Sequence, residues 1–291
     1  MLVSGALSLT PSVAGGGVWY GGRGLFCGGS GLSAIDYITI ATAGNASDFG
    51  DMTTSGETRA LSNGSRAVVD IWGSTTIEYL TIATTGNSTD FGDLSNSRSG
   101  TACCSDGTTG LIAGGTSYVN TIDQLTISTT GNTTDFGDLT GNTGYHGACS
   151  GSTRGVFAGG WSGSVHPNII DFVTIATPGN ATDFGDLTVG RQTSGTSDLT
   201  RGVFAGGWSS PSMYNTIDYI TIATTGNATD FGDLLSTVRW ADLTNDGTTA
   251  VYGGGNSTNV IQKFTIQTTG NATDFGDLTS AKNQSGACSG D

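Results

Sequence analysis

Two kinds of short apolar segment alternate along the chain with clusters of Gly, Asn, Ser and Asp. The first kind ends in paired glycines, as at residues 24–29, and recurs from residues 111, 156, 203 and 251. The second kind is rich in Ile and aromatic residues, begins at residue 35, and recurs from residues 77, 122, 170, 217 and 261. β-Branched and aromatic residues bounded by turn formers predict strands for both kinds. No helical periodicity of useful length appears, so the pattern predicts an all-β protein.

A repeated motif, Thr-Gly-Asn-Ala-Thr-Asp-Phe-Gly-Asp-Leu, follows the second segment and is intact at residues 225–234 and 269–278. Near-copies bring the number of repeats to six, with the central phenylalanine at positions 49, 91, 136, 184, 231 and 275. Gly and Asn predict a tight turn with positive φ. The Asp-Phe-Gly-Asp-Leu stretch predicts a third strand, and a fourth follows before turns such as residues 62–64.

Repeats of this size imply stacking, because a unit of about 45 residues cannot bury its own hydrophobic faces. Six units of four strands predict a six-bladed β-propeller, in which the sheets close into a ring. We therefore expect one domain over residues 23–291. Residues 1–22 match no repeat and are predicted to form an N-terminal arm or cap.

The two ends of the chain predict how the ring closes. Residues 286–291 nearly copy the stretch that begins at residue 147, and residues 286–290 are identical to 147–151, so the chain stops where the next Gly-Gly strand would begin. The Gly-Gly strand without a partner is at residues 24–29. We predict that residues 282–289 pair with it and complete the first blade. In the alternative, residues 14–20 form that innermost strand, but they resemble the repeat poorly.

Composition excludes several classes of protein. The net charge is −14, and the Asp pairs of the motif supply half of the 24 acidic residues. This charge disfavours nucleic-acid binding, which needs clustered Lys and Arg. No basic and apolar N-terminal signal and no long apolar stretch is present, so we expect neither a signal peptide nor membrane insertion.

The five cysteines do not form a framework. Cys104, Cys149 and Cys288 fall at equivalent repeat positions, where other repeats have Leu61, Thr196 and Thr244. That pattern is typical of small buried side chains and does not indicate disulfides or a metal site.

The six Asp-x-x-Asp pairs are candidate Ca²⁺ ligands, since calcium takes carboxylate oxygens in turns. Two carboxylates three residues apart on an extended strand point to opposite faces, however. We therefore favour Asx-type hydrogen bonding to nearby backbone amides. No metal and no cofactor is predicted.

The sequence singles out no catalytic residues. Ser-His-Asp order, a paired Glu motif and a phosphate loop are all missing from the sequence. A hydrolase or lyase acting on polysaccharide through acids in the central channel is the enzymatic alternative, and Asp70 and Glu57 are the acids that would carry it.

Arginine often marks the segment before the fourth strand, at positions 59, 98, 191 and 239.

Candidate binding residues lie after the Gly-Gly pairs, where length and composition vary most. Trp161 and His166 occupy one such loop, and Trp208 and Tyr214 the next. Aromatic residues on loops of a rigid scaffold suit sugar or protein recognition. The alternative role is packing between blades or onto another subunit.

The order of a Gly-Gly strand, a variable loop, a second strand, a turn, an aromatic residue and an arginine resembles the Kelch repeat over residues 23–291. The resemblance implies a Kelch-like propeller but little about activity. Some Kelch-type propellers are copper radical oxidases. Their site needs two His and a cross-linked Tyr and Cys, which His146 and His166 alone do not supply.

The amino-acid sequence of the motif is similar to repeats in structural and tail-fibre-type proteins of marine tailed bacteriophages. This similarity implies a non-enzymatic virion protein, in a tail fibre or other surface appendage, or in capsid decoration. Its implied partners are other virion proteins and a host surface glycan or receptor, with a homo-oligomer in the virion also expected. A host-derived Kelch adaptor is the remaining alternative.

Overall fold

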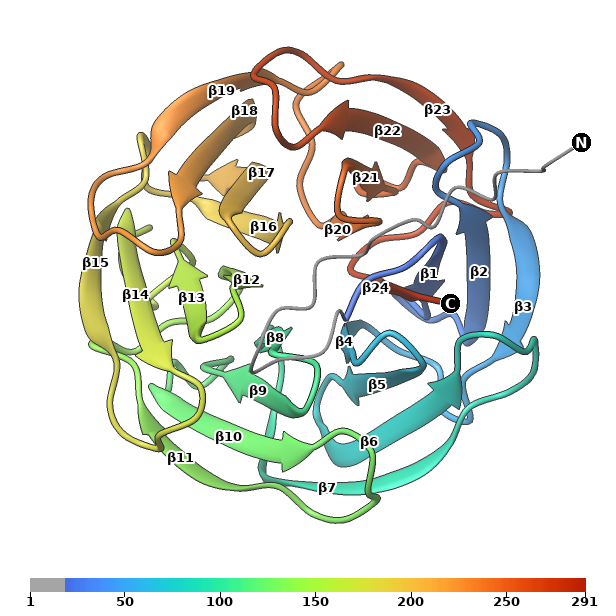
Figure 1. Cartoon of the computed structure of the whole chain (residues 1–291), viewed down its shortest axis with the longest axis horizontal. Helices are drawn as coiled ribbons and strands as arrows, with labels where there is room; N and C mark the ends of the chain where they lie inside the picture. The colour runs from blue at the N-terminus through green and yellow to red at the C-terminus, as the bar shows by residue number, and fades with distance from the viewer. Residues whose placement is uncertain (1–18) are drawn as a thin grey trace, which may run out of the picture.

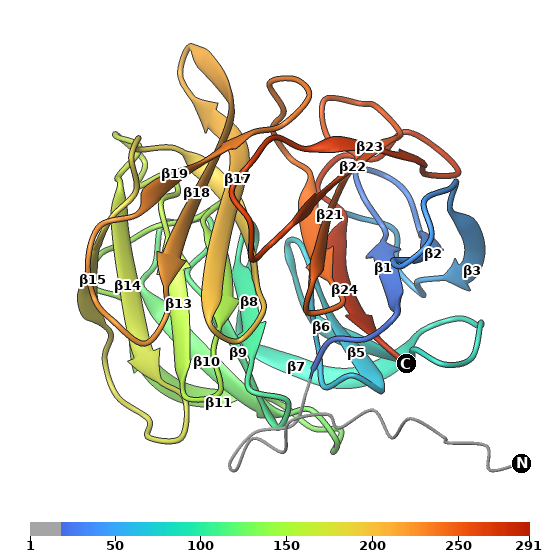
Figure 2. The same ribbon diagram turned by 45° about the horizontal axis from the view of Figure 1, so that its top comes forward.

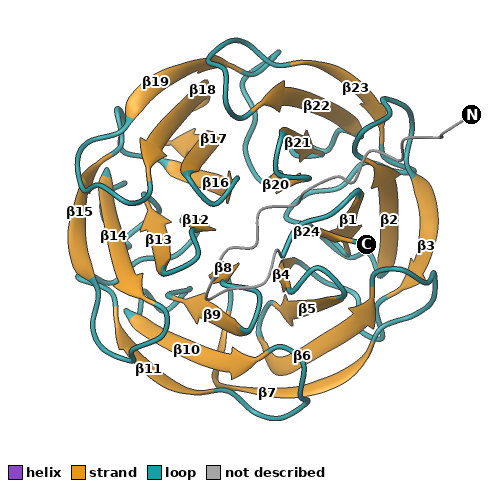
Figure 3. Cartoon of the chain, in the orientation of Figure 1, coloured by secondary structure: helices purple, strands orange, loops and turns teal. Residues whose placement is uncertain are grey.

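The computed structural model describes residues 19–291 as a six-bladed β-propeller built of strands and loops (Figures 1 and 3). Residues 1–18, which include most of the predicted arm, lie outside the described residues. Within the described part no helix is long and apolar enough to cross a membrane. The predicted all-β propeller with four-stranded blades is confirmed.

Each blade is an antiparallel sheet of four strands, and the strands follow one another in order from the channel to the outer rim. The blades, from inner to outer strand, are as follows: β24 (Gly286–Gly290), β1 (Arg23–Cys27), β2 (Ala34–Thr39), β3 (Ser47–Asp51); β4 (Thr58–Ser62), β5 (Arg66–Ile71), β6 (Ser74–Thr81), β7 (Thr89–Arg98); β8 (Ala102–Ser105), β9 (Thr109–Ala113), β10 (Thr121–Thr126), β11 (Thr134–Asp138); β12 (Gly147–Ser150), β13 (Arg154–Ala158), β14 (Ile169–Thr174), β15 (Thr182–Asp186); β16 (Gln192–Ser197), β17 (Arg201–Ser209), β18 (Ser212–Thr221), β19 (Thr229–Asp233); β20 (Asp242–Asn245), β21 (Thr249–Gly253), β22 (Val260–Thr265), β23 (Thr273–Asp277).

The C-terminal strand completes the first blade, as predicted. β24 pairs with β1 over its whole length, with Gly24 opposite Ser289 and Cys27 opposite Gly286. The pairing is shorter than predicted at its start, because residues 282–285 belong to the linker that crosses from the sixth blade. The innermost strand of this blade is therefore β24, and the alternative that placed residues 14–20 there is wrong.

Hydrophobic packing fills every junction between neighbouring blades. The buried side chains form six clusters, and each cluster joins two adjacent sheets. The motif phenylalanines sit in these clusters; Phe231, for example, is 3% exposed and lies 5.3 Å, between ring centroids, from Phe264 of the next blade. The free, mostly buried cysteines fit the predicted role of small core side chains.

The repeated motif docks each blade on the one before it. Between the fourth and fifth blades, the Gly226 and Ala228 amides donate to the carbonyls of Phe184 and Asp186, at 2.7 and 2.8 Å. The Asp186 amide in turn donates to the Asn227 side-chain oxygen at 3.1 Å. The same asparagine contact recurs at all six junctions, with Asn87, Asn132, Asn180, Asn227, Asn271 and Asn45 as acceptors.

This contact corrects two predictions about the motif. The turn asparagines do not adopt positive φ, and they act instead through their side-chain oxygen. The predicted Asx-type bonds of the Asp pairs are likewise made by these asparagines, which lie on the neighbouring blade. Carboxylates such as Asp51 and Asp93 accept bonds from the hydroxyls of Ser33 and Thr75.

A second ring of hydrogen bonds lines the channel. The side-chain hydroxyls of Ser105, Ser150 and Ser197 each donate to the backbone carbonyl of the corresponding residue one blade earlier, at 2.6 Å. Ser62 donates to Ser289, and Ser289 to Asn245, so the ring passes through the closing strand. Only the step from the fifth to the sixth blade differs, where the side-chain nitrogen of Asn245 donates to the Thr196 hydroxyl.

Replacing the motif glycine at the closing junction should weaken the ring. A Cβ on Gly276 would lie 2.3 Å from the Gly44 carbonyl oxygen, and its φ is +151°. We expect Gly276→Ala to lower the free energy of unfolding by about 1–3 kcal/mol, as measured by denaturant titration. The matched control is Gly44→Ala, where an added Cβ meets nothing within 4 Å. Equal stability of the two variants would contradict the docking role of Gly276.

Removing residues 282–291 should abolish cooperative folding. The deletion leaves β1 without its inner partner and opens the ring of serine hydrogen bonds at Ser289, so one blade presents a bare edge. We expect a large fall in melting temperature or loss of a single transition in calorimetry. A melting curve like that of the full chain would mean that the closing strand contributes nothing.

Candidate binding surface on the loop face

The loops after the Gly-Gly pairs and the linkers between blades share one end of the propeller, which we call the loop face. The β17–β18 hairpin extends furthest at this end (Figure 2). Trp208 and Tyr214 therefore lie on strands, and not on the loop that the sequence predicted. Trp208 is opposite Met213, and Tyr214 is opposite Gly207.

Three of the four predicted binding residues meet on the loop face. The rings of Trp161 and His166 have centroids 4.4 Å apart, and those of His166 and Trp208 are 5.1 Å apart and perpendicular. This contact joins the fourth and fifth blades. All three side chains remain partly exposed. The Tyr214 ring makes no aromatic contact with these three rings in the described part of the chain, and its backbone carbonyl accepts the Val238 amide of the linker to the sixth blade.

Sequence reasoning missed three further members of this group. Tyr118 accepts a 3.0 Å hydrogen bond from the Trp161 ring nitrogen. Arg239 lies over the rings of Trp240 and Trp208, with its guanidinium carbon 3.7 and 5.6 Å from the ring centroids. We call these six residues the aromatic cluster: Tyr118, Trp161, His166, Trp208, Arg239 and Trp240.

The backbone at the cluster is strained. Tyr118 and Trp240 have φ of 49° and 65°, a conformation that bulky residues rarely adopt. Such strain persists where the surrounding structure imposes it, and it concentrates at functional sites. The signal in the sequence was available, because aromatic residues at positions 118 and 240 fit no rule of the repeat.

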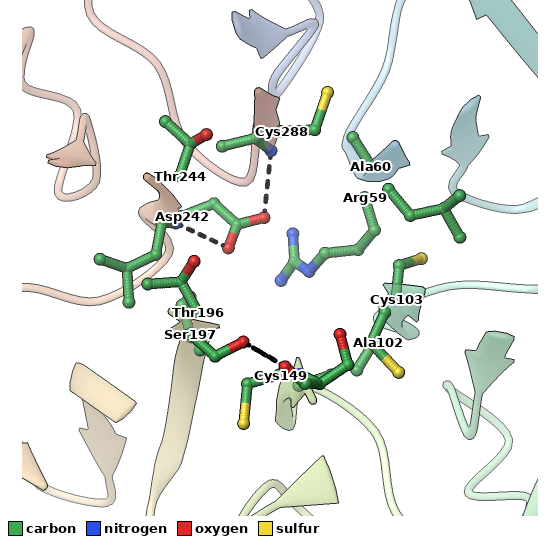
Figure 4. A pocket seen from close by; sticks show the side chains of 18 of the residues that line it. Arg59, Ala60, Ala102, Cys103, Cys149, Thr196, Ser197, Asp242, Thr244 and Cys288 are labelled. Carbon is green, nitrogen blue, oxygen red and sulfur yellow. Dashed lines mark hydrogen bonds between the residues drawn. The ribbon is translucent and has the colours of Figure 1, made fainter. Parts of the chain in front are cut away.

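The central channel holds a second group of unusual side chains. Four blades present small residues at one level of the inner strand: Ala102, Gly147, Ser194 and Gly286. The other two present Arg59 and Asp242. Arg59 reaches into the channel toward Asp242 (Figure 4), and the cavity that both residues line measures about 70 Å³.

The Asp242 carboxylate is hydrogen-bonded to two backbone amides. Its carboxylate oxygens accept the amides of Leu243 and Ala287 at 2.9 and 3.3 Å. Burial raises the pKa of Asp242, and the Arg59 charge and these two amides oppose that effect. Among the described residues it is the only acid that lines this cavity. A glycosidase uses two carboxylates facing one bond.

The two acids singled out from the sequence are not in the channel. Asp70 lies on β5, is 1% exposed and accepts a short hydrogen bond from the Thr101 hydroxyl. Its burial raises the pKa of Asp70 to about 6. Glu57 lies on the linker before β4 and accepts a 2.8 Å bond from Ser30. Asp242, which sequence reasoning missed, was identifiable from the small residues at its equivalents.

No protein-family model matches the chain, and no curated protein matches it.

The four arginines that mark the segment before the fourth strand in the sequence have three different roles in the structure. Arg98 and Arg191 form buried ion pairs, with Asp123 at 2.7 Å and Asp218 at 2.8 Å. Arg59 enters the channel, and Arg239 belongs to the aromatic cluster. Within residues 19–291, no three His, Cys, Asp or Glu side chains gather as metal ligands would.

His146 is the least satisfied polar side chain near the channel. It is 2% exposed, and neither ring nitrogen has a hydrogen-bond partner. Burial, with smaller contributions from the charges of Arg59 and Arg98, lowers the pKa of His146 to about 3 from 6.5. The folded protein therefore holds a neutral His146, whereas the unfolded chain takes up a proton below pH 6.5.

Acid should destabilise the protein through this residue. The stabilising contribution is complete above pH 6.5 and is lost as the pH falls toward 3, at about 1.4 kcal/mol per pH unit. Between pH 6.5 and 5, we expect His146→Leu to remove about 2 kcal/mol of the loss in unfolding free energy seen in the parent. Urea titrations at both pH values measure this.

The control for this experiment is His166→Leu. Burial also lowers the pKa of His166, but that side chain is only partly buried, so the variant should change the pH dependence less. Identical acid sensitivity of His146→Leu and the parent would contradict the assignment.

Proposed function

We propose that the protein is a non-enzymatic recognition module that binds carbohydrate through the aromatic cluster on its loop face. The observation that carries the proposal is the contact of Trp161, His166 and Trp208 across two blades while their rings stay partly exposed. Tryptophan faces pack on the apolar faces of sugar rings, and the polar edges of His and Arg can hydrogen-bond hydroxyl groups.

The propeller supports this role by holding the cluster rigid. The docking contacts and the serine ring fix each blade on its neighbours, so residues from different blades keep constant spacing. A preorganised surface binds with less loss of conformational entropy than a flexible loop. Variable loops on a repeated scaffold are the usual place for recognition.

We place this module in a tailed-phage virion, as part of a tail fibre or other surface appendage in which it displays the loop face to a host glycan. Two similarities support this location. The motif sequence is similar to repeats in phage structural proteins, and the order of strands, turns and marker residues in each repeat is similar to that of Kelch propellers. Capsid decoration would use the same display. A polysaccharide hydrolase or lyase is less well supported, because a single carboxylate lines the channel cavity around Arg59.

Binding to a glycan array tests the proposal. We expect the purified protein to bind a limited set of surface glycans, and Trp161→Ala and Trp208→Ala each to weaken binding at least tenfold, since stacking on the ring is lost. The matched control is Trp72→Ala, because Trp72 lies in the second blade and contacts Tyr145 instead of the cluster. Glycan binding unaltered by both cluster variants would refute the proposal.

A further inference from the structure

An acidic or amide side chain is buried at the same position in every blade. Its equivalents are defined by the register of the two outer strands, since each faces the first Asp of the motif: Asp36, Glu78, Asp123, Asp171, Asp218 and Gln262. All six are at most 6% exposed. A buried carboxylate is costly unless a cation or hydrogen bonds compensate it.

Three of these carboxylates are neutralised by a basic residue from the preceding linker. Arg98 pairs with Asp123 at 2.7 Å, Arg191 with Asp218 at 2.8 Å and Lys282 with Asp36 at 3.7 Å. The three basic residues occupy one position, four residues after the leucine of the motif, which we call the linker position; in the second blade this residue, Arg98, is also the last of β7.

Two other blades solve the same problem without a cation. The sixth blade has Gln262, a neutral side chain, and its linker position is Val238. In the second blade, Glu78 accepts bonds from the Thr53 amide and hydroxyl and from the Ser88 hydroxyl. A buried carboxylate at this position is thus accompanied either by a linker cation or, for Glu78, by an amide and two hydroxyl donors.

The fourth blade has neither a linker cation nor a second hydroxyl donor, since Ala181 stands at the position of Ser88. It keeps the carboxylate of Asp171, but its linker position is Thr143. Thr140 donates its amide and hydroxyl to Asp171, just as Thr188 does to Asp218 in the fifth blade. The cation that accompanies the threonine in the fifth blade has no counterpart in the fourth.

The Thr143 side chain makes only one of the hydrogen bonds that the arginine makes at the equivalent position of the fifth blade. Its hydroxyl donates to the Gly159 carbonyl at 3.3 Å, as the Arg191 Nε donates to the equivalent Gly206 carbonyl at 2.8 Å. The remainder of the arginine side chain is missing, and a cavity of about 460 Å³ lies at this junction.

The cavity walls combine one charge with apolar surface. Asp171, at 6% exposure, and His146, with both ring nitrogens unpartnered, line it beside Leu139, Phe157 and Ile169. Burial raises the pKa of Asp171, and the bonds from Thr140 oppose this effect. Val165 also lines the cavity and is 60% exposed, so the cavity is open to solvent.

The intact junctions show which other groups a cation would meet. Arg191 also donates to the carbonyls of Phe204 and Thr216, at 3.3 and 3.4 Å. The register makes Phe157 and Ile169 their equivalents, and both line the cavity. The acceptor groups of a guanidinium site are therefore present without the guanidinium.

We propose that the cavity between the third and fourth blades binds an organic cation, a guanidinium or ammonium group on a short apolar stem, through Asp171. The cation takes the place that Arg98, Arg191 and Lys282 fill at other junctions. The stem packs against Leu139, Phe157 and Ile169. This site is separate from the aromatic cluster and does not rest on the proposed function.

An NMR titration with n-butylguanidinium tests the proposal on the full-length protein, with n-butylurea as the neutral probe of the same shape. We expect saturable amide shifts around residues 139–146 and 157–171 with n-butylguanidinium, and binding at least tenfold weaker with n-butylurea. Similar binding of the two probes would overturn the proposal, because an apolar cavity alone would then explain it.

Two variants assign the interaction. Asp171→Asn, which keeps an acceptor for Thr140, should weaken n-butylguanidinium binding at least tenfold. Thr143→Arg should abolish it by restoring the arginine of the other blades. The control is Asp183→Asn, which removes the exposed charge opposite Asp171 and should change binding less than twofold. Undiminished binding by Thr143→Arg or by Asp171→Asn would refute the site, and the NMR spectrum shows whether each variant is folded.

A further probe distinguishes a free small cation from a side chain of a partner protein. N-acetyl-arginine-N′-methylamide carries the same group on a peptide backbone. Binding comparable to that of n-butylguanidinium supports a partner's arginine as the occupant. Loss of binding with this probe supports a small free cation.

Discussion

The contact between each Thr-Gly-Asn turn and the outer strand of the preceding blade is the constraint on which the ring depends. It is made by backbone groups and one asparagine oxygen, so it is the same at every junction. The close approach leaves no room for a side chain on the motif glycine, where a Cβ would lie 2.3–2.5 Å from the neighbouring carbonyl oxygen. This geometry explains why the motif repeats almost unchanged while the loops vary.

The propeller is thereby fastened at two radii. The asparagine contacts hold the rim, and the seryl hydroxyls hold the channel, with hydrophobic clusters between them. Both rings include the junction between the sixth and first blades, through Asn45 and Asp277 at the rim and Ser289 and Asn245 at the channel. Because neither ring uses the loops on the loop face, those loops can change in length and sequence without affecting closure. The aromatic cluster occupies this unconstrained region.

The sequence predicted the architecture because repetition makes the local rules visible six times. The number of blades, their four strands and the closing strand all followed from residues such as Phe49 and Cys288. The cluster was only partly predictable. Trp161, His166 and Trp208 could be named from loop composition, whereas the approach of Tyr118 and Arg239 depends on how separate blades sit side by side. Tyr214 was misplaced because the β17–β18 hairpin extends through the expected loop.

Departures from the repeat carried the information that the repeat itself did not. Asp242 and Arg59 are visible in the sequence only as exceptions to small residues, and Thr143 only as an exception to Arg and Lys. In a repeat protein each junction is a control for the others, so a missing partner can be recognised without a related sequence. A carboxylate retained after its cation is lost keeps a desolvation cost that glutamine, as in Gln262, would remove. Asp171 keeps this charge with fewer hydrogen-bond donors than Glu78 and without a linker cation, and the external cation that we propose would neutralise it.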